Sequence, residues 1–422
     1  MPILQMPSQG TVGPQRREVI GIAFGSGLRR ATAVLAGVTG RGLASSFEVV
    51  QAVVRVPSES VMLAFSRLSH GTPGDAGSLA WLATQLADIG IDLVRELSRN
   101  VDLGDCLAIG VDDPGFWQLA DDRPRGRVGI CDGARLAEIT GQTVIDDYPA
   151  RDLACGGQGG PVDALAQWVL LRDKHQDRVL IDLGRTTRLT YVPAFDSPKA
   201  ADRVLAFDVG PGMELLDRLT LELTQGERQF DPGGQLAVQG RQIPELLVHL
   251  LDSPLFQAEP TRWHPRGIAP DWLVAESIRL AIDNQWAMQD VLCTATHLIA
   301  ESIARAIREH VPPSPSLREV IYAGGGQLNG LLLRELGRRL PQLNTVRLGR
   351  LGGRSEHLPA ACAAVLVQMH LDQVPMTHML LTGSDAPRVL GRLNPGAPWA
   401  WRRLLAQIME NSPATMPLRR AV

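Results

Sequence analysis

Residues Ile130–Pro161 read ICDGARLAEITGQTVIDDYPARDLACGGQGGP and hold the most informative pattern of the chain. One acid, Asp152, stands just before a glycine cluster, Gly156-Gly157-Gln158-Gly159-Gly160. An acid beside glycine-rich backbone suits a site at which a ligand approaches the main chain closely. An aspartate before such a turn is also a common cap or turn residue. The pattern by itself leaves both interpretations open.

Two strand-turn-strand units lie on either side of this stretch, at the start of each half of the chain. Val19–Phe24 and Ala31–Leu35 are apolar and flank a glycine turn at residues 25–27. Val179–Gly184 and Leu189–Val192 repeat the arrangement. Apolar runs broken by glycine predict paired strands. The repeated pattern predicts two similar domains with a cleft between them.

Helices are predicted between these strands from the spacing of apolar residues. Asp132–Thr140 is followed by Gly141, a typical helix end. Strands that alternate with helices indicate an α/β fold. The predicted helices are Ser78–Ser98, Asp132–Thr140, Asp163–Leu171, Gln285–Glu309 and Leu331–Leu340.

The length, net charge and cysteine content of the chain indicate how many domains it has and which ligands are not expected. A chain of 422 residues is too long for one compact core, which favours two domains. Its 42 basic and 45 acidic residues give a net charge of −3, so there is no electrostatic reason to expect binding to nucleic acid or to a membrane surface. The five cysteines are widely spaced without a CxxC pair, which argues against a zinc site and favours reduced thiols in the cytoplasm.

The N-terminal residues lack the pattern of an export signal. They read MPILQMPSQGTVGPQRRE, without a charged start followed by an apolar segment. We expect a disordered extension here. No stretch of the sequence reaches the roughly 18 apolar residues of a membrane-spanning helix.

The stretch around Asp152 resembles the central signature of the anhydro-N-acetylmuramic acid kinase family, part of the sugar kinase, Hsp70 and actin superfamily. Two further blocks resemble family motifs in the same order, Phe207–Gly212 (FDVGPG) and Tyr322–Asn329 (YAGGGQLN). The resemblance covers Val19–Pro395. It implies two ribonuclease-H-like domains with an interdomain cleft. The expected division is a disordered extension at 1–17, an N-terminal domain at 18–176, a C-terminal domain with the nucleotide motifs at 177–396, and a tail at 397–422.

The resemblance also implies an activity. Family members use water and ATP, with Mg²⁺, to open the 1,6-anhydro bond of anhydro-N-acetylmuramic acid and phosphorylate O6. The product is N-acetylmuramic acid 6-phosphate, an intermediate of cell-wall recycling in the cytoplasm. The implied partner is this small amino sugar, and a homodimer is a further expectation. Asp152 matches the family's general base, which takes a proton from the attacking water. Arg151, Gly156 and Gly157 match positions near the sugar.

Further matches imply a nucleotide site. Glycines there bring backbone amides to phosphate, or let the base and ribose lie on the main chain. Asp208 would hold a water of Mg²⁺ or bind sugar, although its segment also reads as a plain tight turn. Asn329 also suits a helix cap. No direct metal ligand is assigned. The implied residues are Gly25, Ser26, Gly27, Gly184, Asp208, Gly210, Gly212, Gly324, Gly325, Gly326 and Asn329.

Several ligand-facing loops depart from the family pattern. In the first phosphate loop Arg29 and Thr32 replace two acids, and an arginine cannot bind Mg²⁺. In the second loop Arg185 replaces a glycine where backbone should meet phosphate. Met213 replaces an asparagine. The segment at 261–266 no longer matches its family motif.

The family's His-Gly-Gln-Thr motif is also replaced, by Asp112-Asp113-Pro114-Gly115. Adjacent acids before Pro-Gly are typical of a turn, and they are also able to bind metal or act as acids. These losses leave two alternatives to the family reaction. One is an inactive pseudokinase with a binding or regulatory role, and the other is a kinase for another sugar. An Asp152→Asn change would be tolerated by the pseudokinase, whereas it would stop turnover in either kinase.

Overall fold

The computed structural model describes residues 16–69, 75–120, 123–257, 271–351 and 353–411. Most of the expected N-terminal extension and the 261–266 segment therefore lie outside the described residues. Arg17, which we assigned to the extension, instead begins the first strand. Its guanidinium is buried and pairs with Asp372 at 2.6 Å, which ties the start of the chain to its C-terminal part.

The first sheet has six strands in the order β13-β7-β4-β1-β2-β3. β1, β2 and β3 form an antiparallel meander, whereas β4 and β7 extend the sheet in parallel on the other side of β1. The predicted strands Val19–Phe24 and Ala31–Leu35 are confirmed. The strands are β1 Arg17–Phe24, β2 Ala31–Thr39, β3 Ser46–Arg55, β4 Cys106–Asp112, β7 Val144–Asp146 and β13 Arg392–Asn394.

The second sheet has five strands in the order β10-β9-β8-β11-β12. Its strand directions repeat those of the first sheet, with an antiparallel meander on one side of β8 and parallel strands on the other. The repeated pattern predicted from the sequence therefore corresponds to two α/β units of like topology. The strands are β8 Asp177–Leu183, β9 Thr186–Val192, β10 Leu205–Pro211, β11 Leu317–Ala323 and β12 Asn344–Arg347; β5 Phe116–Ala120 and β6 Arg123–Val128 form a separate hairpin.

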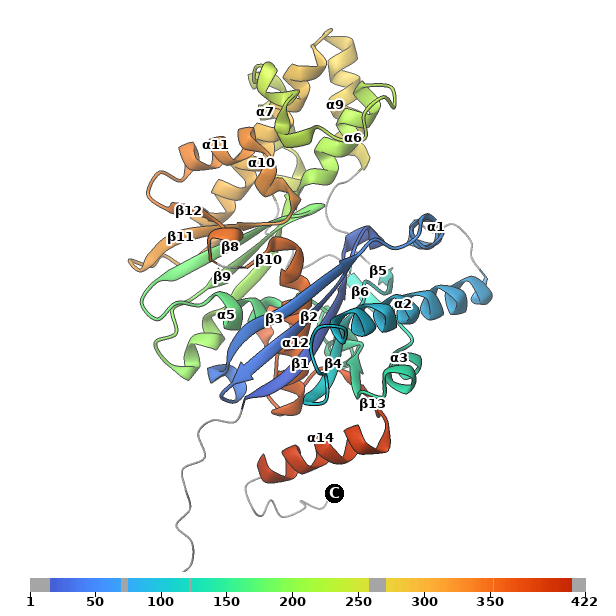
Figure 1. The fold of residues 1–422 in the computed structure, drawn as a ribbon. Coiled ribbons are helices and arrows are strands. Elements are labelled where there is room, and N and C mark those ends of the chain that lie inside the picture. The colour runs from blue at the N-terminus through green and yellow to red at the C-terminus, as the bar shows by residue number, and fades with distance from the viewer. Residues whose placement is uncertain (1–15, 70–74, 121–122, 258–270, 352, 412–422) are drawn as a thin grey trace, which may run out of the picture.

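Two helices lie between the sheets, α5 (Ala164–Leu171) and α12 (Leu358–Leu371). Their side chains form one buried cluster with residues of both sheets, including Val34 of the first and Ile321 of the second. Figure 1 shows α12 beside β1 although it follows the whole second sheet in the chain. The C-terminal part of the chain thus returns to the first unit.

Two glycines of the first sheet allow α12 to pack closely against it. A Cβ atom at Gly21 would lie 1.9 Å from the carbonyl oxygen of Ala360, and one at Gly110 would lie 2.5 Å from that of Ala363. Both carbonyls belong to α12. Because no side chain fits in these spaces, the helix backbone packs directly on strands β1 and β4. This contact holds the two units against each other.

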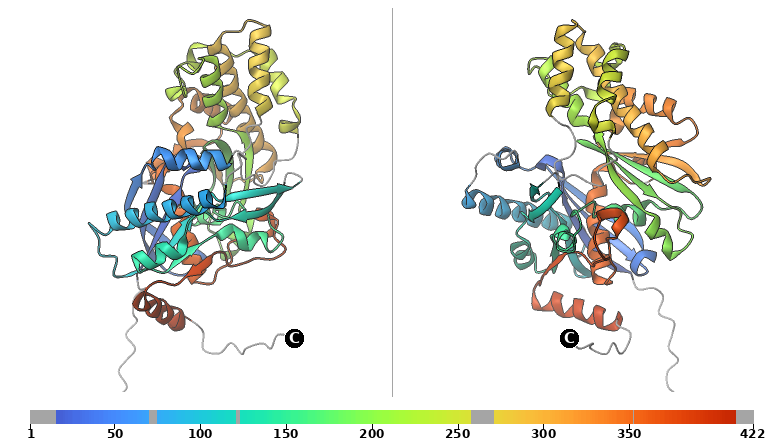
Figure 2. Two further views of the ribbon diagram at one scale, coloured as in Figure 1. Left: turned by 90° about the vertical axis from the view of Figure 1, so that its right-hand side faces the viewer. Right: turned by 180° about the vertical axis from the view of Figure 1, so that it is seen from behind.

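Other helices cover the outer surfaces (Figure 2). α2 and α3 pack on the first sheet, and α10 and α11 on the second. The expected tail begins with α14, which contacts β4. No helix within the described ranges is both long and apolar enough to cross a membrane. The remaining helices are α1 Glu59–Ser69, α2 Ala76–Leu97, α3 Gly133–Thr140, α4 Tyr148–Leu153, α6 Met213–Leu223, α7 Pro244–Leu251, α8 Pro254–Gln257, α9 Asp271–Asp283, α10 Met288–His310, α11 Gly330–Arg339, α13 Met379–Thr382 and α14 Pro398–Asn411.

Candidate functional site

Asp152 lies near the end of α4, and its side chain is completely buried. Both carboxylate oxygens accept hydrogen bonds from the protein. The hydroxyl of Thr382 donates to Oδ1 at 2.6 Å, and the amide of Gly159 donates to Oδ2 at 2.7 Å. Burial raises the pKa of Asp152, and these two donors oppose the rise. A buried acid with a raised pKa is characteristic of proton-transfer sites.

The glycine cluster wraps around this carboxylate. A Cβ atom at Gly157 would lie 2.2 Å from Oδ2 of Asp152, so only glycine fits there. The amide of Gln158 donates to the carbonyl of Thr382 at 2.8 Å, which fastens the cluster to the end of α13. Gly156 has a positive φ of 79° and is exposed, as is Arg151. The residues predicted to contact sugar therefore surround Asp152, with Arg151 on the outer side of α4.

Asp113, one of the two acids that replace the family's histidine motif, has a structural role. Its carboxylate pairs with Arg127 at 2.5 Å and accepts the amide of Cys131 at 3.1 Å. Arg127 is nearly fully buried and also pairs with Asp147, the residue before α4. This network links the β5–β6 hairpin to the helix that carries Asp152.

Asp112 instead faces a group of charged side chains around Arg188. Arg188 Nε lies 3.1 Å from Oδ1 of Asp208, and its Nη1 lies 3.7 Å from Oδ1 of Asp163. Burial and the Asp163 carboxylate raise the pKa of Asp112 to about 7. Burial likewise raises the pKa of Asp182 to about 6, although Arg188 opposes the rise. The cluster joins strands β4, β8, β9 and β10.

Asp208, predicted to serve the cofactor, is thus an ion-pair partner of Arg188 in this conformation, and its side chain is buried. Among the described residues, no group of three or more acidic, histidine or cysteine side chains is arranged to hold a metal ion. Mg²⁺ needs only one or two carboxylates when phosphates supply the other ligands.

The two predicted phosphate loops approach each other. Gly27 has a φ of 72° in the β1–β2 turn, which Gly25 closes by donating its amide to the carbonyl of Arg30 at 2.8 Å. A Cβ atom at Gly27 would lie 3.9 Å from Nη1 of Arg185, in the β8–β9 turn after Gly184. Arg185 in turn pairs with Glu214 at 2.7 Å. Ser26 lies in the same turn, at the start of a 3-10 segment.

The amides at the start of α6 are already bonded. Gly212 and Glu214 donate to the carbonyl of Arg185 at 3.1 and 3.2 Å, and Met213 donates to that of Gly184 at 2.9 Å. Gly210, with a φ of 153°, lies just before them at the end of β10. The amide of Gly212, which was predicted to face a phosphate, is therefore bonded within the protein.

The Tyr322–Asn329 segment, predicted to lie under the nucleotide, forms a turn after β11. A Cβ atom at Gly324 would lie 2.5 Å from Oδ1 of Asp182, and one at Gly326 would lie 2.9 Å from the sulfur of Met213. Gly325 has no atom within 4 Å of its Cβ position, so its backbone is open. Asn329 caps α11 by accepting the amide of Leu332 at 3.0 Å. The turn is therefore open at Gly325, and Asn329 acts as a helix cap, which is one of the two roles predicted for it.

Sequence reasoning missed three participants. Thr382, Asp163 and Arg188 were not assigned to the site. A threonine 230 positions from Asp152 leaves no local signal. The replacement of a family asparagine by Arg188, close to the new Asp182, was the one visible sign of a charged cluster.

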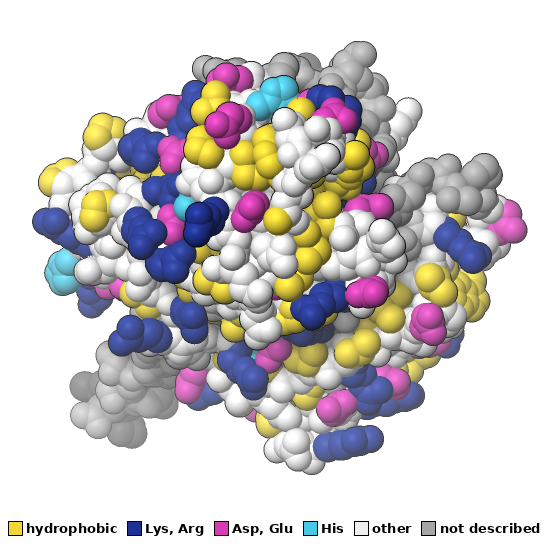
Figure 3. Space-filling model, turned by 90° about the horizontal axis from the view of Figure 1, so that it is seen from above, with side chains coloured by type: hydrophobic (Ala, Val, Ile, Leu, Met, Phe, Trp, Pro, Cys, Tyr) yellow, Lys and Arg dark blue, Asp and Glu magenta, His cyan; other side chains and the backbone are white. Residues whose placement is uncertain are grey.

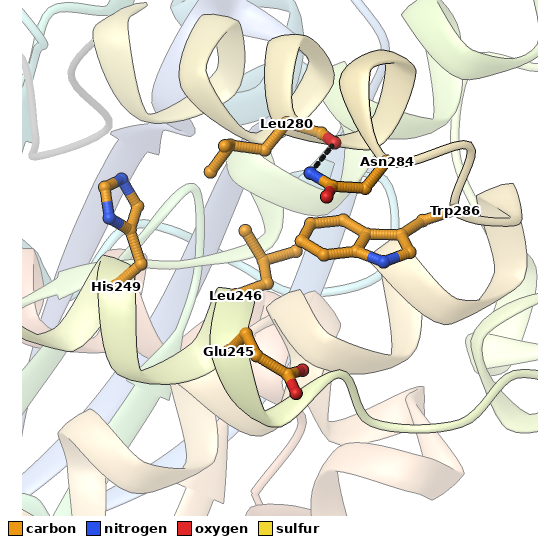
Figure 4. A pocket seen from close by; sticks show the side chains of 6 residues that line it. All are labelled: Glu245, Leu246, His249, Leu280, Asn284 and Trp286. Carbon is orange, nitrogen blue, oxygen red and sulfur yellow. Dashed lines mark hydrogen bonds between the residues drawn. The ribbon is translucent and has the colours of Figure 1, made fainter.

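A pocket of about 530 Å³ lies away from these loops, between α7 and α9 (Figure 4). Trp286 and Leu246 point into it, while His249 stands at its side and bonds to Glu276 at 2.9 Å. Figure 3 views this helical end and shows hydrophobic side chains interspersed with charged ones. None of the predicted site residues lines the pocket; its lining residues are Glu245, Leu246, His249, Leu280, Asn284 and Trp286.

A model of a known protein family aligns with most of this chain. The family model described as anhydro-N-acetylmuramic acid kinase aligns with residues 17–396, nearly the whole chain. The chain belongs to the anhydro-N-acetylmuramic acid kinase family. The match includes the strand β13, which returns to the first sheet, and ends just before α14.

Relatives in this family share low sequence identity with this chain but align with it over nearly their whole length. The anhydro-N-acetylmuramic acid kinase of Cupriavidus pinatubonensis is 32% identical over 89% of this chain and 98% of its own length. That of Caldanaerobacter subterraneus is 26% identical over 90% of this chain and 97% of its own. A solved gluconate kinase from Lactobacillus acidophilus aligns over 94% of this chain and 97% of its own, with 10% identity and a TM-score of 0.44.

Proposed function

We propose that this protein is an ATP-dependent kinase of 1,6-anhydro-N-acetylmuramic acid. The observation that carries the proposal is the enclosed carboxylate of Asp152, kept within a family match that spans residues 17–396. The reaction consumes the anhydro sugar, water and ATP and yields N-acetylmuramic acid 6-phosphate and ADP. We further propose that it proceeds in the cytoplasm, where the five cysteines, all free in the structure, stay reduced.

Asp152 is the proposed general base. Its carboxylate takes a proton from the water that attacks the anomeric carbon, while the released O6 accepts the phosphoryl group. Both oxygens are enclosed in the described conformation, so the attacking water reaches them only when Thr382 or the Gly157–Gly159 segment moves away. The raised pKa makes Asp152 a stronger base than an exposed aspartate.

ATP fits the turn after β11, because the open backbone at Gly325 leaves room for a base or ribose. ATP would supply the phosphoryl group, and Mg²⁺ would neutralise its phosphates, with Asp182 and Asp112 as the carboxylates that would hold the ion. The chain's own part is to orient the sugar at the glycine cluster and to exclude bulk water around Asp152.

The test is a turnover assay of the purified protein with Mg²⁺, ATP and the anhydro sugar. The expected result is sugar-dependent ADP release, with a product that has gained one phosphate and one water. In water labelled with heavy oxygen, the label should enter the anomeric hydroxyl and not the phosphate. ADP release that the sugar does not stimulate, or that persists unchanged in Asp152→Asn, would refute the proposal and leave the pseudokinase or a different sugar.

A further inference from the structure

The two arginines that replace residues of the family's phosphate loops flank one glycine. A Cβ atom at Gly27 would lie 3.9 Å from Nη1 of Arg185 and 3.9 Å from Cγ of Arg29. Arg29 follows the β1–β2 turn of the first unit, and Arg185 lies in the β8–β9 turn of the second. The Arg185 guanidinium of the second unit and the aliphatic part of the Arg29 side chain of the first therefore lie beside the same glycine.

Each of these arginines is associated with a carboxylate of α6. Arg185 makes a two-pronged contact with Glu214, at 2.7 and 3.2 Å, and its side chain remains 42% exposed. Arg29 is exposed and acts electrostatically on Asp217, one helical turn further along α6. Burial raises the pKa of Asp217 to about 6, and Arg29 opposes that rise. Neither arginine is buried in the core, so both are accessible to a ligand.

The first amides of α6 do not offer hydrogen bonds to a phosphate chain. The amides of Gly212, Met213 and Glu214 are bonded to the carbonyls of Arg185 and Gly184. A guanidinium presents a planar fork of donors that matches phosphate oxygens as well as it matches a carboxylate. The same fork that holds Glu214 can therefore exchange that carboxylate for a phosphate.

We propose that Arg185 and Arg29 form a polyphosphate-binding pair, in which Glu214 holds the Arg185 guanidinium in place until the phosphates of a nucleoside triphosphate displace it. The pair takes over the role of the backbone amides that α6 does not offer. The inference deepens the proposed function, because the ligand is the phosphoryl donor of that reaction, but it concerns binding and needs no turnover.

The test measures binding by calorimetry, without sugar, using Mg²⁺-ATP, inorganic tripolyphosphate and adenosine as separate probes. Arg185→Gln and Arg29→Gln should each weaken binding of ATP by about tenfold, since each loses a charge-assisted contact. Their affinity for adenosine should stay unchanged. Tripolyphosphate should compete with ATP in the wild type and compete less well in both variants, which shows that the phosphate chain itself is recognised.

Glu214→Gln should change the affinity for ATP in the opposite direction. Because it removes the carboxylate that competes with phosphate, we expect it to tighten ATP binding several-fold. A purely structural Arg185–Glu214 pair would instead make both variants bind more weakly. Arg218→Gln is the matched control, since Arg218 lies on the same helix but pairs with Asp271 at 2.6 Å, and it should bind ATP like the wild type.

Two outcomes would overturn the inference. One is a wild type that binds no ATP, and the other is unchanged ATP affinity in Arg185→Gln and Arg29→Gln with circular dichroism showing intact folds. A wild type that binds ATP through these arginines but never phosphorylates the anhydro sugar would refute the proposed function alone, and would leave the binding pair standing.

Discussion

Thr382 donates its hydroxyl hydrogen to Oδ1 of Asp152 at 2.6 Å, although the two residues are 230 positions apart in the chain. The threonine is completely buried and lies at the end of α13. Its hydrogen bond favours the charged carboxylate and so lowers the pKa of Asp152 against the effect of burial. The proton affinity of the proposed base is thus set by a residue outside its own motif.

Thr382→Val should raise the pKa of Asp152 further, because valine has nearly the same shape but no donor. Asp152 acts as a base only when it is deprotonated, so the acidic limb of the pH–rate profile should move to higher pH. Thr382→Ser keeps a hydroxyl and should leave the limb near its wild-type position. If Thr382→Val lowers the maximal rate but leaves the acidic limb of the pH–rate profile at the same pH, the role given to this hydrogen bond is contradicted.

Asp152→Asn should abolish most turnover while the protein stays folded. The amide oxygen can accept from Gly159, and the amide nitrogen can donate to the Thr382 hydroxyl. Loss of a general base lowers kcat by roughly 10²–10⁴-fold. Because burial raises the pKa of Asp152 in the folded protein, the charged form is disfavoured there relative to the unfolded chain, and the variant should have a higher free energy of unfolding at neutral pH.

Urea denaturation at pH 7.5, together with kcat measurements, checks the result for Asp152→Asn. The exposed Asp105→Asn is the control for loss of one negative charge and should change neither quantity. A variant of Asp152 that is strongly destabilised would mean that the carboxylate serves the fold rather than the reaction.

Asp112 should make the protein less stable as the pH rises. The unfolded chain loses this proton near pH 3.8, whereas the folded protein keeps it until about pH 7. Between these values the folded state binds more protons, so the free energy of unfolding falls with increasing pH. Asp112→Asn should weaken that dependence and exceed the wild type by about 1–2 kcal/mol at pH 8. Urea titrations of both proteins across pH 5–8 would reveal parallel curves if Asp112 did not titrate in this range.

Gly21→Ala should destabilise the contact between α12 and the first sheet. The added methyl group would lie 1.9 Å from the carbonyl oxygen of Ala360, so the helix must shift. Overpacking of this kind costs about 1–3 kcal/mol or more. Gly337→Ala, in α11 where no atom lies within 4 Å of the Cβ position, should instead stabilise by about 0.5–1 kcal/mol. Thermal unfolding of the two variants should therefore shift in opposite directions.

Much of the fold could be predicted from local sequence. The apolar run Val19–Phe24 and the helical spacing of Ser78–Ser98 correspond to β1 and α2, because burial of one face leaves a periodic signature. Residues 207–212 were interpreted either as a nucleotide-binding segment or as a tight turn, yet most of them lie in strand β10, Leu205–Pro211. Its glycines and proline obscure a strand that is defined by pairing with β9.

In the candidate site, too, local contacts could be predicted from the sequence and long-range contacts could not. The contact between Asp152 and Gly157 follows from their closeness in the chain. The contacts that Thr382 and Arg188 make depend on how distant segments pack, which no local pattern encodes. Arg185 was expected to obstruct a phosphate, but the structure places its guanidinium between the two turns, paired with Glu214. The catalytic role of Asp152 stays a prediction until turnover is measured.

The return of α12 and β13 to the first sheet has a consequence for synthesis of the protein. All five strands of the second sheet have been made once residue 347 leaves the ribosome, whereas the first sheet still lacks its covering helix and its edge strand until residue 394. Domains generally fold as units while the chain is being made. Here the N-terminal unit is begun first and completed last, so its exposed strands β1 and β4 need protection from aggregation for most of the time that the chain is being translated.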